Sequence, residues 1–336
     1  MRSLLLSCLT AVLAFGEWSP DPAHSLDLGT GMMPEIAASS DGGLYVAWLT
    51  EGDFHIYLQR LNAAGTPQWT PGGRLISAQP NNSWIAIFHL NLVTDSDGNA
   101  IITSVDTRSG NWEIYAYKIG PDGNQLWGEN GVTLSSTGGD NIGPRMTLVP
   151  DDNSVIVTWS QDYSSLRLQR ISPEGGLLWG ANGISLSDLG GDYISPQPIM
   201  TSAGSVIVQW IRQTGNFPAL SSQVLVRQYD LNGSALWPVI SMNPAIGFPM
   251  GNWTQNCLPV PAYGNYSSWT ELAGNNQTGK VNHLDGSGSL SWAAPIEVSL
   301  ESTHFRVSPQ LAAATGSQAV YAVWNETDAS QVDRGI

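Results

Sequence analysis

The sequence predicts an all-β fold built from about six similar units, and three observations lead to this prediction. Tryptophans recur at two positions of a repeat, at intervals of 51 to 59 residues along the 336-residue chain. Each unit contains four alternating apolar and polar runs separated by turn residues, which is typical of short antiparallel strands. Only 12% of the residues are charged, while 36 are Gly and 20 are Pro, which disfavours a helical bundle. Four strands in a repeat of about 55 residues predict a β-propeller with four-stranded blades.

The first tryptophan series closes a β-prone run near the middle of each unit. Ser154–Trp159 and Ser205–Trp210 share the pattern Ser-Val-Ile-Val-x-Trp. The series consists of Trp48, Trp159, Trp210, Trp269 and Trp324, and Val105 takes the corresponding place in the second unit. A buried Trp removes roughly 150–250 Å² from water. We therefore expect this series to form the core between neighbouring blades.

The second tryptophan series follows a turn late in each unit. It consists of Trp18, Trp69, Trp127, Trp179, Trp237 and Trp292. Four of these residues end similar tails, of which Asp122–Trp127 (Asp-Gly-Asn-Gln-Leu-Trp) is the clearest. A Gly-rich turn before a strand predicts a hairpin, so we expect a third strand, a tight turn and then a fourth strand. These tryptophans are also expected in the core.

The third unit shows the expected strands most clearly. They are Pro144–Val149, Val155–Trp159, Leu166–Ile171 and a last strand from Leu177 to about Leu186. The same division places blades at about 34–77, 86–137, 144–187, 195–241, 253–298 and 307–336, the last together with 17–28. Residues 17–336 are thus expected to form a single propeller.

The N-terminus has the layout of a secretory signal peptide over residues 1–16, with Arg2 before the apolar run Leu4–Phe15. Residues 17–28 resemble a lone fourth strand, which would complete the last blade and protect its edge. The third strand of that blade is missing, so either the blade is one strand short or the chain is a piece of a longer protein. We expect a secreted protein, extracellular or at a bacterial cell surface, with no membrane span in the mature chain.

Charge and motifs exclude several functions. A net charge of −15 disfavours nucleic-acid binding, which needs clustered cations. The five His form no close pair, and neither a phosphate-binding loop nor a nucleophile elbow occurs. Asp95–Asn99 resembles the start of a calcium loop but lacks the Glu near its end, so a turn is expected there. We expect no cofactor, no metal site and a monomer, with Cys257 as a buried free thiol.

The repeat resembles that of bacterial secreted and cell-surface β-propeller proteins of mostly unassigned function. The likeness rests on the Val-x-Trp and Asp-Gly-x-x-Leu-Trp tracts and on third-strand segments such as Ile56–Leu61 and Leu166–Ile171. The hairpin before Trp127 also has a distant likeness to the Asp-box of sialidases, in which such hairpins are structural. The resemblance implies the fold and no catalytic residue.

Candidate binding residues lie in the loops that gather at one mouth of a propeller. They combine aromatic faces with carboxylates, which suits sugar or peptide recognition. The candidates are Trp84, Asp106, Trp112, Glu113, Asp162, Tyr163, Tyr193 and Trp253. Three hypotheses remain open: a non-catalytic propeller that binds an extracellular glycan or protein, which we favour; a glycoside hydrolase or lyase with paired carboxylates such as Asp106 and Asp162; and a structural module of a larger surface protein.

Overall fold

The computed structural model describes residues 26–81, 90–134, 136–187, 189–216, 219–243, 255–273, 276–298, 305–314 and 319–327. These ranges contain strands and no helix, and hence no helix that is long and apolar enough to cross a membrane. The strands form five four-stranded sheets and one two-stranded sheet.

The sheets follow one another along the chain, and neighbouring strands within each sheet are consecutive in the sequence. The first sheet contains β1 (Met32–Ala38), β2 (Leu44–Leu49), β3 (Ile56–Leu61) and β4 (Arg74–Ser77), and the second contains β5 (Asn91–Thr94), β6 (Ala100–Asp106), β7 (Glu113–Ile119) and β8 (Val132–Thr133). The third contains β9 (Asn141–Val149), β10 (Ser154–Gln161), β11 (Ser165–Ile171) and β12 (Ile184–Leu186), and the fourth contains β13 (Asp192–Met200), β14 (Val206–Thr214), β15 (Ser221–Tyr229) and β16 (Ile240–Ser241). The fifth contains β17 (Asn256–Val260), β18 (Gly264–Ala273), β19 (Asn276–Leu284) and β20 (Ile296–Glu297), and the last contains β21 (Phe305–Ala313) and β22 (Val320–Thr327).

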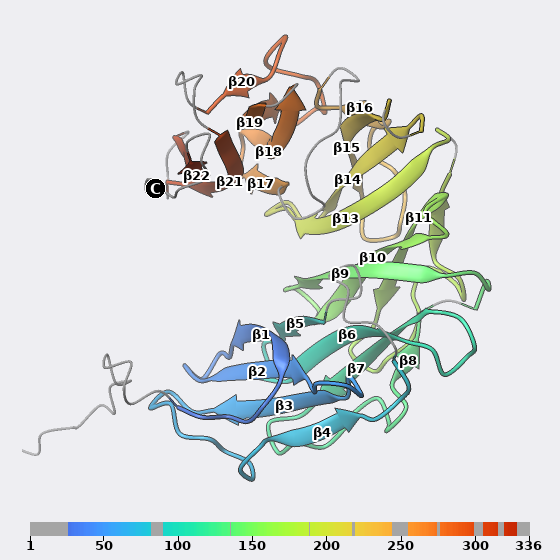
Figure 1. Cartoon of the computed structure of the whole chain (residues 1–336), viewed down its shortest axis with the longest axis vertical. Coiled ribbons are helices and arrows are strands. Elements are labelled where there is room, and N and C mark those ends of the chain that lie inside the picture. Colours follow the sequence, from blue (N-terminus) through green and yellow to red (C-terminus); the bar gives the residue numbers. More distant parts are fainter. Residues whose placement is uncertain are drawn as a thin grey trace, which may run out of the picture.

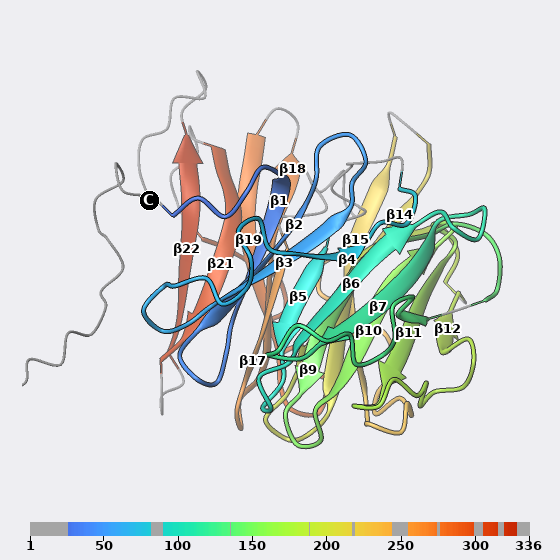
Figure 2. The same ribbon diagram turned by 90° about the horizontal axis from the view of Figure 1, so that it is seen from below.

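The sheets are arranged around an arc, with the first strand of each sheet nearest the centre (Figure 1). Each of these first strands contacts the first strand of the following sheet. Figure 2 shows the strands running between two ends of the molecule, where the turns gather. The all-β class and the four-stranded units are confirmed. Six complete blades and closure of the ring stay predictions, because Trp18 and residues 328–336 lie outside the described ranges.

Three members of the first tryptophan series pack their sheet against the preceding one. Trp159 is fully buried among apolar side chains of the second sheet, and Trp210 is buried in the same way against the third. Trp269 packs against the fourth sheet. Trp48 is also buried, and Gly29 and Gly73 lie against its ring. Trp324 is half-buried at the end of the arc.

The second sheet departs from this series by one residue. Ala100 and Ile102 face the first sheet, whereas Ile101 and Val105 pack toward the third. Because side chains alternate between the two faces of a strand, Ser104 occupies the tryptophan position and Val105 does not. The predicted place of Val105 is therefore wrong by one position.

The second tryptophan series ties each sheet to the next one along the chain. The indole nitrogens of Trp69, Trp127 and Trp179 donate to the carbonyl oxygens of Pro121 (3.4 Å), Pro173 (2.9 Å) and Leu231 (3.2 Å), which all occupy the same hairpin position. These three indoles, and those of Trp237 and Trp292, are half-buried. This series therefore lies at the rim of the core.

Glycine is required in these hairpins because the indole of the preceding sheet lies directly against the turn. Gly175 has a φ of 91°, which favours glycine, and a Cβ there would come within 3.0 Å of the Trp127 ring. Gly233 meets the Trp179 ring in the same way. The Gly in the hairpin tract thus serves both the turn and the packing of the next indole.

Candidate functional site

The first strand of four sheets carries a β-bulge at a proline. Its pairing with the second strand skips two residues, and these are Met33-Pro34, Gly143-Pro144, Ser195-Pro196 and Ser308-Pro309. The residue before proline has a left-handed φ of 54° at Met33 and 52° at Ser195. Such a conformation in a non-glycine residue costs on the order of 1–3 kcal/mol, and bulges re-aim the following side chain. The residue after each proline is therefore a candidate for function.

Polar residues occupy the position after each bulge, and the same register in the two sheets without one. Each pairs with the second-strand residue just before the first tryptophan position. The pairs are Glu35–Ala47, Asn91–Thr103, Arg145–Thr158, Gln197–Gln209, Asn256–Ser268 and Gln310–Val323. The first-strand members of these pairs, Glu35, Asn91, Arg145, Gln197, Asn256 and Gln310, are called the inner polar row. The strands that carry this row, the first of each sheet, lie along the inner edge of the arc (Figure 1).

Glu35 and Arg145 are the charged members of the row, and both are half-buried. Burial raises the pKa of Glu35, and the positive charge of Arg145 offsets part of this effect. Burial lowers the pKa of Arg145, and Glu35 opposes that change. Glu35 lies in the first sheet and Arg145 in the third, and β5 of the second sheet contacts both β1 and β9. The two charges therefore interact across β5. A carboxyl group with a raised pKa exchanges protons nearer neutral pH than a surface Glu does.

The amide members of the row bond to neighbouring sheets. Asn91 Oδ1 accepts from the backbone nitrogen of Met146 (3.1 Å). Gln197 Nε2 donates to the carbonyl oxygen of Gln255 (3.3 Å). Asn256 Nδ2 donates to Gln310 Oε1 (3.4 Å). One side of the row is thus charged and the other is neutral, with amide groups that can both donate and accept.

Asp106 was expected at the mouth, but its carboxylate is engaged within its own sheet. It is buried and forms an ion pair with Arg108, with 2.6 Å between Oδ2 and Nη2 and a further bond from Nε to Oδ1 (3.0 Å). The Arg108 guanidinium also lies 3.8 Å from the centre of the Tyr115 ring and bonds to the Tyr117 hydroxyl. This closed network holds the turn after β6.

Glu113 and Tyr193 are also buried with internal partners. Glu113 Oε1 accepts from Asn141 Nδ2 (2.7 Å), and Asn141 Oδ1 accepts from the Trp159 indole (2.7 Å). The Tyr193 ring stacks on Trp210 at 6.5 Å, and its hydroxyl accepts from the backbone nitrogen of Leu189 (2.9 Å). These side chains stabilise the contacts between neighbouring sheets.

Three other predicted residues, Asp162, Tyr163 and Trp112, are exposed or half-buried. Asp162 is exposed, and its Oδ1 accepts from the backbone nitrogen of Asp140 (2.7 Å). Tyr163 is 41% exposed, and burial together with Asp192 and Asp140 raises its pKa. Trp112 is half-buried against the core between the second and third sheets. Their role in binding stays a prediction, and Trp84 and Trp253 lie outside the described residues.

The inner polar row was not among the sequence-based candidates. A signal for it exists, because Pro34-Glu35, Pro144-Arg145, Pro196-Gln197 and Pro309-Gln310 recur at similar places in their units. Within the described residues, no group of three or more His, Cys, Asp or Glu side chains could hold a metal ion.

Comparison with solved structures shows similarity to enzymes. An ulvan lyase of polysaccharide lyase family PL25 matches with a TM-score of 0.51 and 9% identity, over 91% of this chain and 84% of that one. The polysaccharide lyase Uly1 matches at 0.49 with 8% identity, over 87% and 74% of the two chains. The GH93 α-L-arabinofuranosidase of Fusarium graminearum matches at 0.49 with 12% identity, over 90% and 94%. No protein-family model and no curated protein sequence matches the chain.

The match to the ulvan lyase and the four-stranded sheets, which fit propeller blades, support a propeller-type all-β fold. The favoured hypothesis of a non-catalytic ligand-binding module is corrected by this comparison, because the ulvan lyase that matches at a TM-score of 0.51 is a polysaccharide lyase. The enzyme alternative is taken up below as a proposal. Secretion and the monomeric state stay predictions.

Proposed function

We propose that this protein is a polysaccharide-degrading enzyme whose reaction takes place at the inner polar row. The single observation that carries the proposal is that the half-buried Glu35 and Arg145 occupy equivalent positions of a row of amides, close enough for each charge to influence the pKa of the other. Strained bulges at Met33 and Ser195 support it, since such strain gathers at functional sites. The fold similarity to a polysaccharide lyase is in line with this assignment.

The composition of the row favours elimination over hydrolysis. Hydrolysis of a glycosidic bond uses two carboxyl groups, roughly 5–10 Å apart. Among the described members of the row, Glu35 is the one carboxyl, and Asp106 of the predicted pair is bound to Arg108. Elimination instead needs one acid–base group and donors that neutralise a sugar carboxylate. Arg145 and the row amides can supply such donors.

The proposed reaction is a β-elimination on a uronate unit. Arg145 and an amide N–H bind the sugar carboxylate and stabilise the charge that develops when the adjacent carbon loses its proton. The Glu35 carboxylate takes this proton, a carbon–carbon double bond forms, and the glycosidic carbon–oxygen bond breaks. The proton held by Glu35 then goes to the departing oxygen.

An activity assay tests the proposal. Purified protein is incubated with acidic polysaccharides (ulvan, pectate, alginate) and neutral ones (arabinan, xylan), and reducing ends and ultraviolet absorbance of an unsaturated product are followed. We expect both signals with an acidic substrate, and a loss of at least 100-fold in rate for Glu35→Gln. The matched control is Glu129→Gln, at an exposed site in the turn before β8, which should retain full activity.

Two outcomes would contradict the proposal. One is the absence of turnover on every polysaccharide by a protein whose fold is verified by circular dichroism. The other is an unchanged rate for Glu35→Gln. Reducing ends without an unsaturated product would show hydrolysis, and would reject elimination while keeping polysaccharide cleavage.

A further inference from the structure

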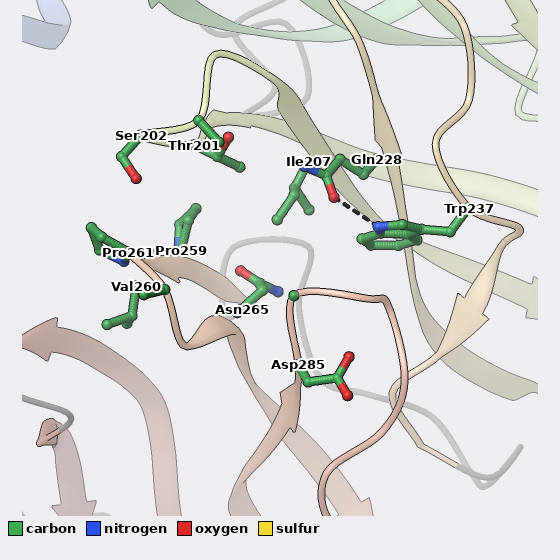
Figure 3. A pocket seen from close by; sticks show the side chains of 14 residues that line it. Thr201, Ser202, Ile207, Gln228, Trp237, Pro259, Val260, Pro261, Asn265 and Asp285 are labelled. Atoms are coloured by element: carbon green, nitrogen blue, oxygen red, sulfur yellow. Dashed lines mark hydrogen bonds between the residues drawn. The ribbon is translucent and has the colours of Figure 1, made fainter.

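A pocket of about 250 Å³ lies between the fourth and fifth sheets, at the end of the molecule where the β13–β14 and β19–β20 turns lie (Figure 3). It is separate from the inner polar row. Its apolar wall includes Ile207, Trp237 and Val260, and its polar groups include Asn265 and Asp285.

At this junction the second-series indole makes a different contact from the one it makes at the three preceding junctions. Trp69, Trp127 and Trp179 donate to the hairpin of the following sheet. The Trp237 indole instead donates to Gln228 Oε1 of its own sheet (2.7 Å), as Figure 3 shows.

The hairpin residue opposite Trp237 leaves the space open. Pro121, Pro173 and Leu231 occupy this position in the second, third and fourth sheets, and the fifth sheet has Gly286 there. A Cβ at Gly286 would have nothing within 4 Å, and the φ of this residue is not left-handed. The volume that a proline or leucine side chain fills elsewhere is therefore free.

The geometry points to a second carbohydrate site in this pocket, one that binds a neutral sugar unit. No Lys, Arg or His is among the described residues that line it, so an anionic group would lack a counter-charge next to the Asp285 carboxylate. Asp285 Oδ1 accepts from the backbone nitrogens of Ser287 (2.8 Å) and Ser289 (3.0 Å) in its own turn, which fixes the carboxylate in place, and hydrogen bonds from Ser287 and Ser289 lower the pKa of Asp285. A held carboxylate beside apolar surface suits a sugar, whose hydroxyls donate while its C–H face packs.

Filling the pocket tests the inference. Xylobiose, arabinobiose and lactose are titrated into the full chain and followed by ligand-observed NMR. We expect at least one to bind, and Gly286→Leu, which restores the residue type of Leu231, to weaken that binding at least tenfold. The matched control is Glu174→Leu in the third-sheet hairpin, which also adds an exposed leucine and should leave binding unchanged. Thermal melts verify that both variants are folded.

The Glu35→Gln variant of the inner polar row separates this inference from the proposed function. Glu35→Gln should abolish turnover and leave the binding of the neutral disaccharide intact. The inference is overturned if none of the three sugars binds. It is also overturned if Gly286→Leu binds as tightly as the unmodified chain.

Discussion

Lys118 and Asp95 form a buried ion pair, with 2.9 Å between Nζ and Oδ2 and side-chain exposures of 4% and 0%. Burial alone would raise the pKa of Asp95, but hydrogen bonds from Asn99 and Lys118 outweigh it and hold that pKa below its ordinary value. Lys118 Nζ also donates to the carbonyl oxygen of Pro173 in the next sheet (3.2 Å). The pair therefore helps join the second sheet to the third.

Replacing Lys118 should be far more costly than replacing Lys280, the other lysine of the chain. Lys118→Met leaves the Asp95 carboxylate buried without its cation, which costs roughly 3–5 kcal/mol. Lys280 pairs with Glu297 at 2.7 Å on a half-exposed edge, and loss of such a pair costs about 0–1 kcal/mol. Urea denaturation of both variants measures the difference. Equal losses would contradict the structural role given to the Lys118–Asp95 pair.

At the scale of the strand and the hairpin, the two tryptophan series differ in burial and so should differ in their contribution to stability. Trp159 is 0% exposed, whereas Trp179 is half-buried at the rim. Trp159→Ala should lower the free energy of unfolding by about 3–5 kcal/mol, and Trp179→Ala should lower it by less. Chemical denaturation of the two variants gives both values. A larger loss for Trp179→Ala would contradict the assignment of the first series to the core.

The strands could be predicted from the sequence because the repeat is strong. The third unit shows this best, since the expected strand Leu166–Ile171 lies within β11 (Ser165–Ile171). Val105 was assigned to the tryptophan position because both Ser104 and Val105 fit the sequence pattern. A shift of one residue along a strand moves each side chain to the other face of the sheet, so the structure distinguishes the two where the pattern does not.

The candidate site could be predicted much less well. Asp106 resembles a free carboxylate in the sequence, and only the folded turn shows that Arg108, two residues later, binds it. Glu35 and Arg145 lie 110 positions apart in the sequence, and the curvature of the arc brings them within electrostatic reach. Local pattern carries no information on such a long-range approach.

At the scale of the whole molecule, the arc places one polar residue from each sheet along a common inner edge. The net charge of −15 is spread over the chain, whereas Arg145 gives this edge a local cation. A negatively charged protein would repel a polyanion at long range, but salt screens such repulsion beyond about 10 Å at 0.1 M. The acidity of the molecule as a whole is therefore compatible with the proposed binding of a uronate by Arg145.

The most direct measurement is a crystal structure of the Glu35→Gln protein soaked with an acidic oligosaccharide that the unmodified protein is found to cleave. The account predicts density for the sugar chain along the inner edge, with a uronate carboxylate within hydrogen-bonding distance of the Arg145 guanidinium and residue 35 facing the carbon that loses its proton. Density confined to the loops around Asp162 and Tyr163, with the inner edge empty of sugar, would contradict it.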